Sequence, residues 1–244
     1  MVQGIIFDYG GTIDTNSTHW SEVLWEGYRN IGIPVCKDEF RTSYVFAERE
    51  LARHPYIQPG HNFLDLLSIK CDLETTDLVA RGVWHTSDNE RKEKSDAVAQ
   101  YCYNYVLNVL KVSRPIIQRL AEKYPLVLVS NFYGNIKTIL DDFHLQYFHH
   151  IVESAVVGVR KPDPKIFQMG VDALRQITGK TEEELPANDI LVIGDSFSKD
   201  ILPATHIGCQ TVWIKGTGWG DEEADESIPT HIIDNIEKLE AIIE

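Results

Sequence analysis

Short apolar runs alternate with longer amphipathic stretches from about residue 113 onward. This alternation is typical of strands and helices that follow one another in a parallel sheet. The runs that predict strands are 126–129, 151–152, 190–193 and 211–214, and the N-terminal run 5–7 is expected to join them. The pattern therefore predicts an α/β fold with five short strands in a Rossmann-like parallel sheet.

Two amphipathic stretches of this region are preceded by residues that commonly begin helices. Ser113 and Pro115 precede the apolar run 116–120, and Asp163-Pro164 precedes a helical pattern over 165–177. Serine and aspartate cap helix N-termini, and proline is tolerated in the first turn. We therefore expect one helix to begin at about Ser113 and another at about Pro164.

The segment 16–112 differs from the rest of the chain because it contains helix formers at helical apolar spacing and few strand-like runs. Such a segment, placed directly after the first strand, predicts a helical insert. The expected organisation is a core formed by residues 1–15 and 113–244, with residues 16–112 forming a helical cap.

Composition narrows the classes of partner. The net charge of −14 and the pI near 5.0 disfavour binding to nucleic acid or to an anionic membrane. An anionic substrate must therefore meet a local positive pocket.

The four cysteines lie too far apart for a zinc or redox motif, and the N-terminus has no leader-like apolar segment. A cytoplasmic protein with reduced cysteines is expected.

Candidate chemistry begins where the first predicted strand ends. Asp8 follows the apolar run 5–7, and the loop then continues with Gly10, Gly11 and Thr12. Ligands of open α/β sheets bind at the carboxyl ends of strands, and glycines let backbone N–H groups approach an anion closely. This loop is a candidate anion site.

Three later segments place polar residues at equivalent positions. Ser130 and Asn131 follow the second predicted strand, where a hydroxyl and an amide can donate to a phosphoryl oxygen. Lys161 precedes the helix expected at 165–177, and its ammonium can neutralise a carboxylate and a phosphate together. Asp195 and Asp200 follow the run 190–193 and form an acidic pair suited to magnesium.

These four segments, in this order, resemble the four signature motifs of the haloacid dehalogenase superfamily. The helical insert likewise resembles the cap of one large branch of that family. The resemblance implies a phosphatase-type hydrolase in which Asp8 is the covalent nucleophile and Lys161 stabilises Asp8 and the phosphoryl charge. It implies a small phosphorylated metabolite as substrate and Mg²⁺ as cofactor. The implied substrate-binding residues are Gly11, Thr12, Ser130, Asn131 and Lys161, and the implied metal ligands are Asp8, Gly10, Asp195 and Asp200.

The chain departs from the family pattern at Gly10, which stands where the family's phosphatases have a general-acid aspartate. General acid catalysis contributes roughly 10² to 10⁴ in rate, so hydrolysis of ordinary alkyl phosphoesters should be impaired.

One alternative is a phosphatase for substrates with good leaving groups. A second is a phosphonatase-like enzyme, and a third is a binding or regulatory protein without turnover. A dehalogenase is a further alternative, but the retained Asp195 and Asp200 disfavour it. A phosphonatase would need a cap lysine for a Schiff base, and the candidates are Lys37, Lys70, Lys92 and Lys94.

Other polar residues have less specific interpretations. Asp14 is expected to be a polar hinge residue and not a displaced general acid. Arg41, Arg49 and Arg53 share one helical face, which is compatible with a substrate anion or with a solvated salt-bridge face. The acidic run 221–226 is expected to be a solvated loop.

Overall fold

The centre of the fold is a parallel sheet, which we describe in a computed structural model over residues 1–216 and 224–243. The six strands of the described residues have the order β3-β2-β1-β4-β5-β6. Their bounds are β1 Gly4–Phe7, β2 Leu126–Ser130, β3 His150–Glu153, β4 Ile190–Gly194, β5 Gln210–Ile214 and β6 His231–Ile233. All five predicted strands are confirmed, and β6 is an addition that the sequence did not predict.

The central strand β1 lies between β2 and β4. Phe7 pairs in register with Leu128 on one side and with Ile193 on the other. Beyond the strand, the Asp8 backbone N–H donates to the Ile193 carbonyl at 2.9 Å, so the pairing with β4 extends to Asp8. All four residues of β1 are buried. Because helices cover both faces of a parallel sheet, its strands are continuously apolar, which explains the short apolar runs.

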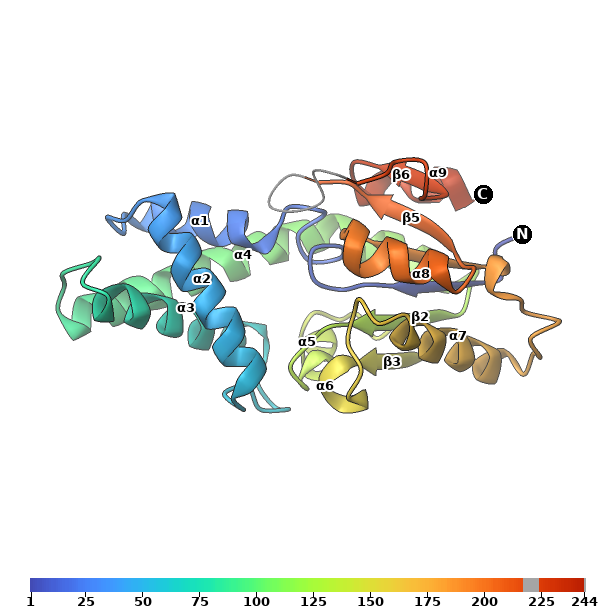
Figure 1. The fold of residues 1–244 in the computed structure, drawn as a ribbon, viewed down its shortest axis with the longest axis horizontal. Coiled ribbons are helices and arrows are strands. Elements are labelled where there is room, and N and C mark those ends of the chain that lie inside the picture. Colours follow the sequence, from blue (N-terminus) through green and yellow to red (C-terminus); the bar gives the residue numbers. More distant parts are fainter. Residues whose placement is uncertain (217–223, 244) are drawn as a thin grey trace.

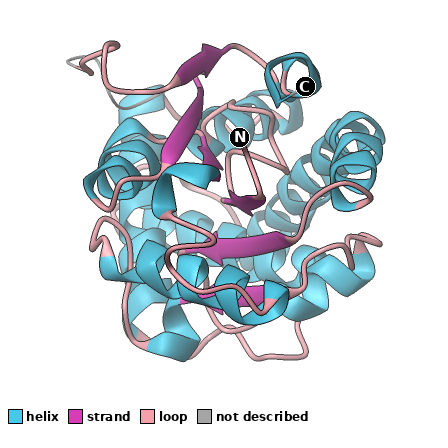
Figure 2. Ribbon diagram, turned by 90° about the vertical axis from the view of Figure 1, so that its right-hand side faces the viewer, coloured by secondary structure: helices cyan, strands magenta, loops and turns pink. Residues whose placement is uncertain are grey.

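Helices pack on both faces of this sheet (Figures 1 and 2). The core helices are α5 Ile136–Asp142, α6 Ser154–Val157, α7 Lys165–Thr178, α8 Leu202–His206 and α9 Glu240–Ile243. Short helical turns cover Ala187–Asp189, Phe197–Ile201 and Ile236–Lys238. The helix expected at about Pro164 is confirmed as α7, and Gly170 lets it approach β2, since a Cβ there would lie 2.8 Å from Val129.

The insert after β1 is helical, as predicted. Its helices are α1 Trp20–Ile31, α2 Lys37–Arg53, α3 Phe63–Ala80 and α4 Asp88–Ala121. Figure 1 shows α1, α2 and α3 on one side of the sheet, at its carboxyl edge, while α4 runs from them to the core. We use the name cap for residues 16–112.

The helix start predicted at Ser113 is wrong. Helix α4 is continuous over 34 residues, contains Pro115 in its interior and is capped at its N-terminus by Ser87. The buried Ser113 hydroxyl does not cap a helix; it donates to the Ile13 carbonyl at 2.9 Å and thereby ties α4 to the loop after β1. Ser113 and Pro115 therefore suggested a helix start, whereas the helix passes through both residues and buries several side chains around them.

Two further properties concern the whole described chain. Among the described helices, none has the length and apolar content that crossing a bilayer would require. The four cysteines are free thiols, of which Cys36 is exposed and Cys71, Cys102 and Cys209 are buried.

Candidate active site

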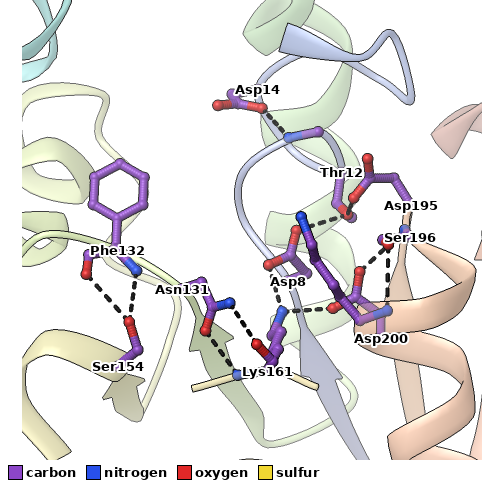
Figure 3. A network of polar contacts seen from close by, with 12 residues as sticks. Asp8, Thr12, Asp14, Asn131, Phe132, Ser154, Lys161, Asp195, Ser196 and Asp200 are labelled. Atoms are coloured by element: carbon purple, nitrogen blue, oxygen red, sulfur yellow. Dashed lines mark hydrogen bonds and ion pairs between the residues drawn. The ribbon is translucent and has the colours of Figure 1, made fainter. Parts of the chain in front are cut away.

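Polar side chains from four separate segments meet at the carboxyl edge of the sheet (Figure 3). Asp8 follows β1, Asp195 follows β4, and Asp200 lies in the helical turn Phe197–Ile201. Lys161 comes from the loop between α6 and α7, and Ser130 is the last residue of β2. The fold therefore brings together residues from all four predicted motifs. Among them, Asp8, Ser130, Lys161 and Asp200 are almost completely buried.

Lys161 forms a bridge between two of the carboxylates. Its Nζ atom donates to Asp8 Oδ1 and to Asp200 Oδ1, at 2.6 Å in each case. Burial alone would lower the pKa of Lys161, but the charges of Asp200 and Asp8 raise it above its ordinary value. Lys161 is therefore a fixed positive charge at the base of the site.

Three carboxylates lie close enough to share one cation. One oxygen from each of Asp8, Asp195 and Asp200 lies within 4.8 Å of the others. Burial and the nearby charges of Asp8 and Asp200 raise the pKa of Asp195 well above its ordinary value, and burial raises that of Asp200 to about 6. One ammonium cannot neutralise three carboxylates, so the site favours a further cation. An all-oxygen donor set fits Mg²⁺.

Two glycines make this close packing possible. Gly11 has a φ of +98°, and a Cβ there would lie 2.2 Å from Asp195 Oδ2. At Gly194 a Cβ would lie 2.4 Å from the Cβ of Asp200. In contrast, apart from Gly10 and its two chain neighbours, no atom of the described residues lies within 4 Å of a Cβ built at Gly10. Glycine is thus sterically required at positions 11 and 194, but not at position 10.

Hydrogen bonds with buried side chains hold the loop after Asp8 in place. The Thr12 hydroxyl lies 3.1 Å from Asp8 Oδ2 and 3.4 Å from Asp195 Oδ1. Asp14 accepts from the Gly11 backbone N–H at 2.7 Å and from the indole N–H of Trp20 at 3.1 Å. One carboxylate oxygen of Asp14 therefore has a donor in the loop and the other has a donor in the cap, while its role as a hinge residue remains a prediction. The substrate-binding roles of Gly11 and Thr12 remain predictions.

Asn131 has a contact that the sequence did not predict. Its amide pairs with the backbone of Lys161, donating from Nδ2 to the carbonyl at 3.1 Å and accepting the Lys161 N–H at 2.9 Å. This pairing fixes the loop that carries Lys161, so Asn131 positions the lysine. No local sequence signal joins two residues so distant in the chain. Substrate contacts of Asn131 and of Ser130 remain predictions.

Comparison with known proteins identifies the family of the chain. Residues 2–208 match the family model of haloacid dehalogenase-like hydrolases. A curated relative, named glyceraldehyde 3-phosphate phosphatase, comes from Methanopyrus kandleri. It is 36% identical over 95 residues, which are 38% of this chain and 37% of the relative. The chain therefore matches little more than a third of that protein's length.

Solved structures share the fold over the full chain. The YfnB protein of Bacillus subtilis, determined with bound magnesium, is 17% identical, with a TM-score of 0.58 and coverage of 100% of this chain and 99% of that chain. The L-2-haloacid dehalogenase RSc1362 is 19% identical, with a TM-score of 0.59 and coverage of 99% and 98%. These likenesses concern the fold, and the family match covers most of the sequence. The chain belongs to the family of haloacid dehalogenase-like hydrolases.

Proposed function

We propose that the protein is a magnesium-dependent phosphatase that acts on a small phosphorylated metabolite through an aspartyl-phosphate at Asp8. The observation that supports this most strongly is the buried set of Asp8, Asp195 and Asp200, whose oxygens lie within 4.8 Å of one another and contact Lys161. A curated relative named as a phosphatase adds support over the matched segment.

In the proposed reaction, an Asp8 carboxylate oxygen attacks the substrate phosphorus. A P–O bond forms to Asp8, and the bond to the leaving group breaks with its electron pair passing to the leaving oxygen. Water then attacks the phosphorus of the aspartyl-phosphate, which releases inorganic phosphate and restores the Asp8 carboxylate. Lys161 holds Asp8 in place and offsets part of the charge that accumulates on the phosphoryl oxygens.

Magnesium would be held by Asp8, Asp195 and Asp200 with the carbonyl of Gly10. When bound, it would supply the positive charge that reduces repulsion between an anionic nucleophile and an anionic substrate. The raised pKa of Asp195 supports this role, because burial and the neighbouring carboxylates leave its negative charge poorly compensated.

The substitution by glycine at position 10 restricts the leaving group. Gly10 has no side chain to protonate the departing oxygen, and Asp14 directs its oxygens at Gly11 and Trp20. We infer that the preferred substrates carry phosphate on a group that leaves readily without protonation. Acyl phosphates, phosphoanhydrides and aryl phosphates have this property.

The contacts of the cap lysines give little support to the phosphonatase alternative. A Schiff base requires a neutral amine. Lys70 is paired with Glu48, whose charge raises the Lys70 pKa well above its ordinary value against the effect of burial. Lys37 pairs with Glu22 at 2.6 Å, and Lys94 donates to the Gly32 carbonyl at 2.9 Å.

The test is release of inorganic phosphate from acetyl phosphate, p-nitrophenyl phosphate, glyceraldehyde 3-phosphate and phosphonoacetaldehyde, with Mg²⁺ or with EDTA. We expect Mg²⁺-dependent release that is fastest from the acyl and aryl phosphates. Asp195→Asn should abolish release, whereas Asp189→Asn, which changes a carboxylate outside the site, should not. Absence of release from every phosphate would contradict the proposal and favour a binding or regulatory role.

A further inference from the structure

Two helices of the cap are joined by an ion pair between Glu48 and Lys70. Glu48 belongs to α2 and Lys70 to α3, and the Lys70 ammonium donates to Glu48 Oε1. The Lys70 Nζ also lies 4.4 Å from the ring centroid of Tyr44. The other Glu48 oxygen, Oε2, accepts from the Tyr133 hydroxyl at 3.1 Å. Glu48 therefore joins two cap helices to a residue of the core.

This pair lies beside the catalytic edge of the sheet. Tyr133 belongs to the loop that directly follows Ser130 and Asn131. Burial raises the pKa of Tyr44, and the negative charge of Asp195 contributes to the rise. The charge of Lys199, adjacent to Asp200, likewise acts on Glu48. Tyr44, which lies against Lys70, is thus within electrostatic range of Asp195, and Glu48 is within range of Lys199 and contacts the loop that follows β2.

Glu48 is anchored and still accessible. Its side chain is 38% exposed, whereas that of Lys70 is 6% exposed. Burial would raise the pKa of Glu48, but the Lys70 charge lowers it below its ordinary value, so the pair is ionic at neutral pH. Because the two charges cancel, the pair offers an acceptor and donors without a net charge.

An ion pair without net charge matches hydroxyl groups. A substrate hydroxyl can donate to Glu48 and accept from Lys70, and it does not displace either partner. A substrate carboxylate would gain attraction from Lys70 but would meet like-charge repulsion from Glu48, which costs affinity. The expected discrimination is therefore by charge at the end of the substrate remote from phosphate.

We propose that Glu48 and Lys70 are specificity-determining residues that bind the hydroxyl groups of the substrate beyond its reacting phosphate and exclude phosphorylated carboxylic acids. Tyr133 is a positioning residue that holds Glu48. This proposal rests on the proposed function, because it concerns the substrate of the same site. It narrows the substrate class to hydroxyl-bearing phosphates.

The test measures binding and does not require turnover. Calorimetry at neutral pH with Mg²⁺ compares two probes of similar size, glycerol 3-phosphate and 3-phosphoglycerate, with inorganic phosphate as a reference. We expect the wild type to bind glycerol 3-phosphate at least about tenfold more tightly than 3-phosphoglycerate, because the carboxylate faces Glu48. Equal affinities, or tighter binding of 3-phosphoglycerate, would overturn the proposal without any variant.

Glu48→Gln provides the second part of the test. It keeps the shape of the side chain and leaves the Lys70 charge uncompensated, so the affinity ratio should shift at least about tenfold towards 3-phosphoglycerate. Binding of inorganic phosphate should change less than about twofold, and the matched control Glu50→Gln should leave the ratio unchanged. Equal weakening of all three ligands would indicate a merely structural role and would overturn the proposal.

The two proposals fail in distinguishable ways. Absence of phosphate release with the selective binding retained would contradict the phosphatase and leave the specificity pair supported. Phosphate release with an unselective wild type would contradict the specificity pair alone.

Discussion

The Nζ atom of Lys161 lies 2.6 Å from Oδ1 of Asp8, although 153 residues separate the two in the chain. The contact fixes the orientation of the carboxylate that we propose as nucleophile. Lys161 also places a positive charge directly beside the Asp8 carboxylate. Asn131 supports this contact by pairing with the Lys161 backbone.

Replacement of Lys161 by methionine should reduce turnover by at least about a hundredfold, because preorganised charge at the reacting centre is lost. The measurement is kcat/KM for acetyl phosphate with saturating Mg²⁺. Lys165→Met is the matched control, since Lys165 is exposed on α7 and outside the site. Turnover within a few-fold of wild type would show that Asp8 does not depend on this lysine.

Gly10→Asp should increase hydrolysis of alkyl phosphoesters such as glycerol 3-phosphate. The position has space for a side chain, since no described atom beyond the neighbouring residues lies within 4 Å of the added Cβ. A supplied general acid contributes roughly 10² to 10⁴, and an increase of at least about tenfold is expected from an imperfectly placed one. Gly10→Asn is the control, because an amide fills the same space without an acidic proton. Equal rates for the two variants would show that the missing acid is not the limiting feature.

Asp14→Asn should affect stability more than catalysis. An amide cannot accept both donors that now reach Asp14, the Gly11 N–H and the Trp20 indole, so one hydrogen bond is lost. Burial raises the pKa of Asp14 to about 7, so the proteins are compared at pH 5, where the carboxyl carries little charge and the variant gains little by removing it. There we expect the free energy of unfolding to fall by about 1 to 3 kcal/mol. Turnover of acetyl phosphate should fall less than about tenfold. A loss of a hundredfold or more, with the unfolding free energy unchanged, would instead identify Asp14 as a displaced general acid.

Glu74 should make the stability of the cap depend on pH. Burial raises the pKa of this fully buried carboxyl from 4.5 to about 7, and among described residues its Oε1 has no hydrogen-bond partner. Because the folded pKa is raised, the stabilisation is present below the unfolded pKa and is lost as pH rises through about 7. Tyr28 donates to the other oxygen at 3.0 Å.

The check is chemical denaturation of the wild type and of Glu74→Gln between pH 5 and pH 8. The difference between their unfolding free energies should change by about 2 kcal/mol over this range, in favour of the variant at high pH. Parallel curves for the two proteins would mean that Glu74 does not titrate in this window.

The fold was predictable where each element has its own local signal. The strands β1, β2, β4 and β5 are apolar because helices cover them, and α7 is amphipathic. The strand β6 contains only three residues, including a polar histidine, and it is recognisable only by its pairing with β5. Helix α4 continues through Pro115 because its packing outweighs the proline signal. Of the acidic run 221–226, residues 221–223 lie outside the described residues.

The sequence predicted which residues come together in the candidate site better than it predicted the contacts between them. The order of the four motifs indicated Asp8, Lys161, Asp195 and Asp200, since the ends of parallel strands meet at one edge. Which group each side chain contacts depends on tertiary structure. The pairing of Glu48 with Tyr133 joins an insert to a core loop 85 residues away, and no periodicity or spacing indicates such a contact.

The most direct test of the central claim is a search for phosphate on Asp8 itself. The protein is mixed with acetyl phosphate and Mg²⁺, quenched in acid within the first turnover, digested, and the peptide containing Asp8 is analysed by mass spectrometry. We predict phosphorylation of Asp8 that disappears with EDTA, together with no phosphate release by a folded Asp8→Asn variant. Phosphate release without modification of Asp8, or undiminished release by Asp8→Asn, would contradict the claim.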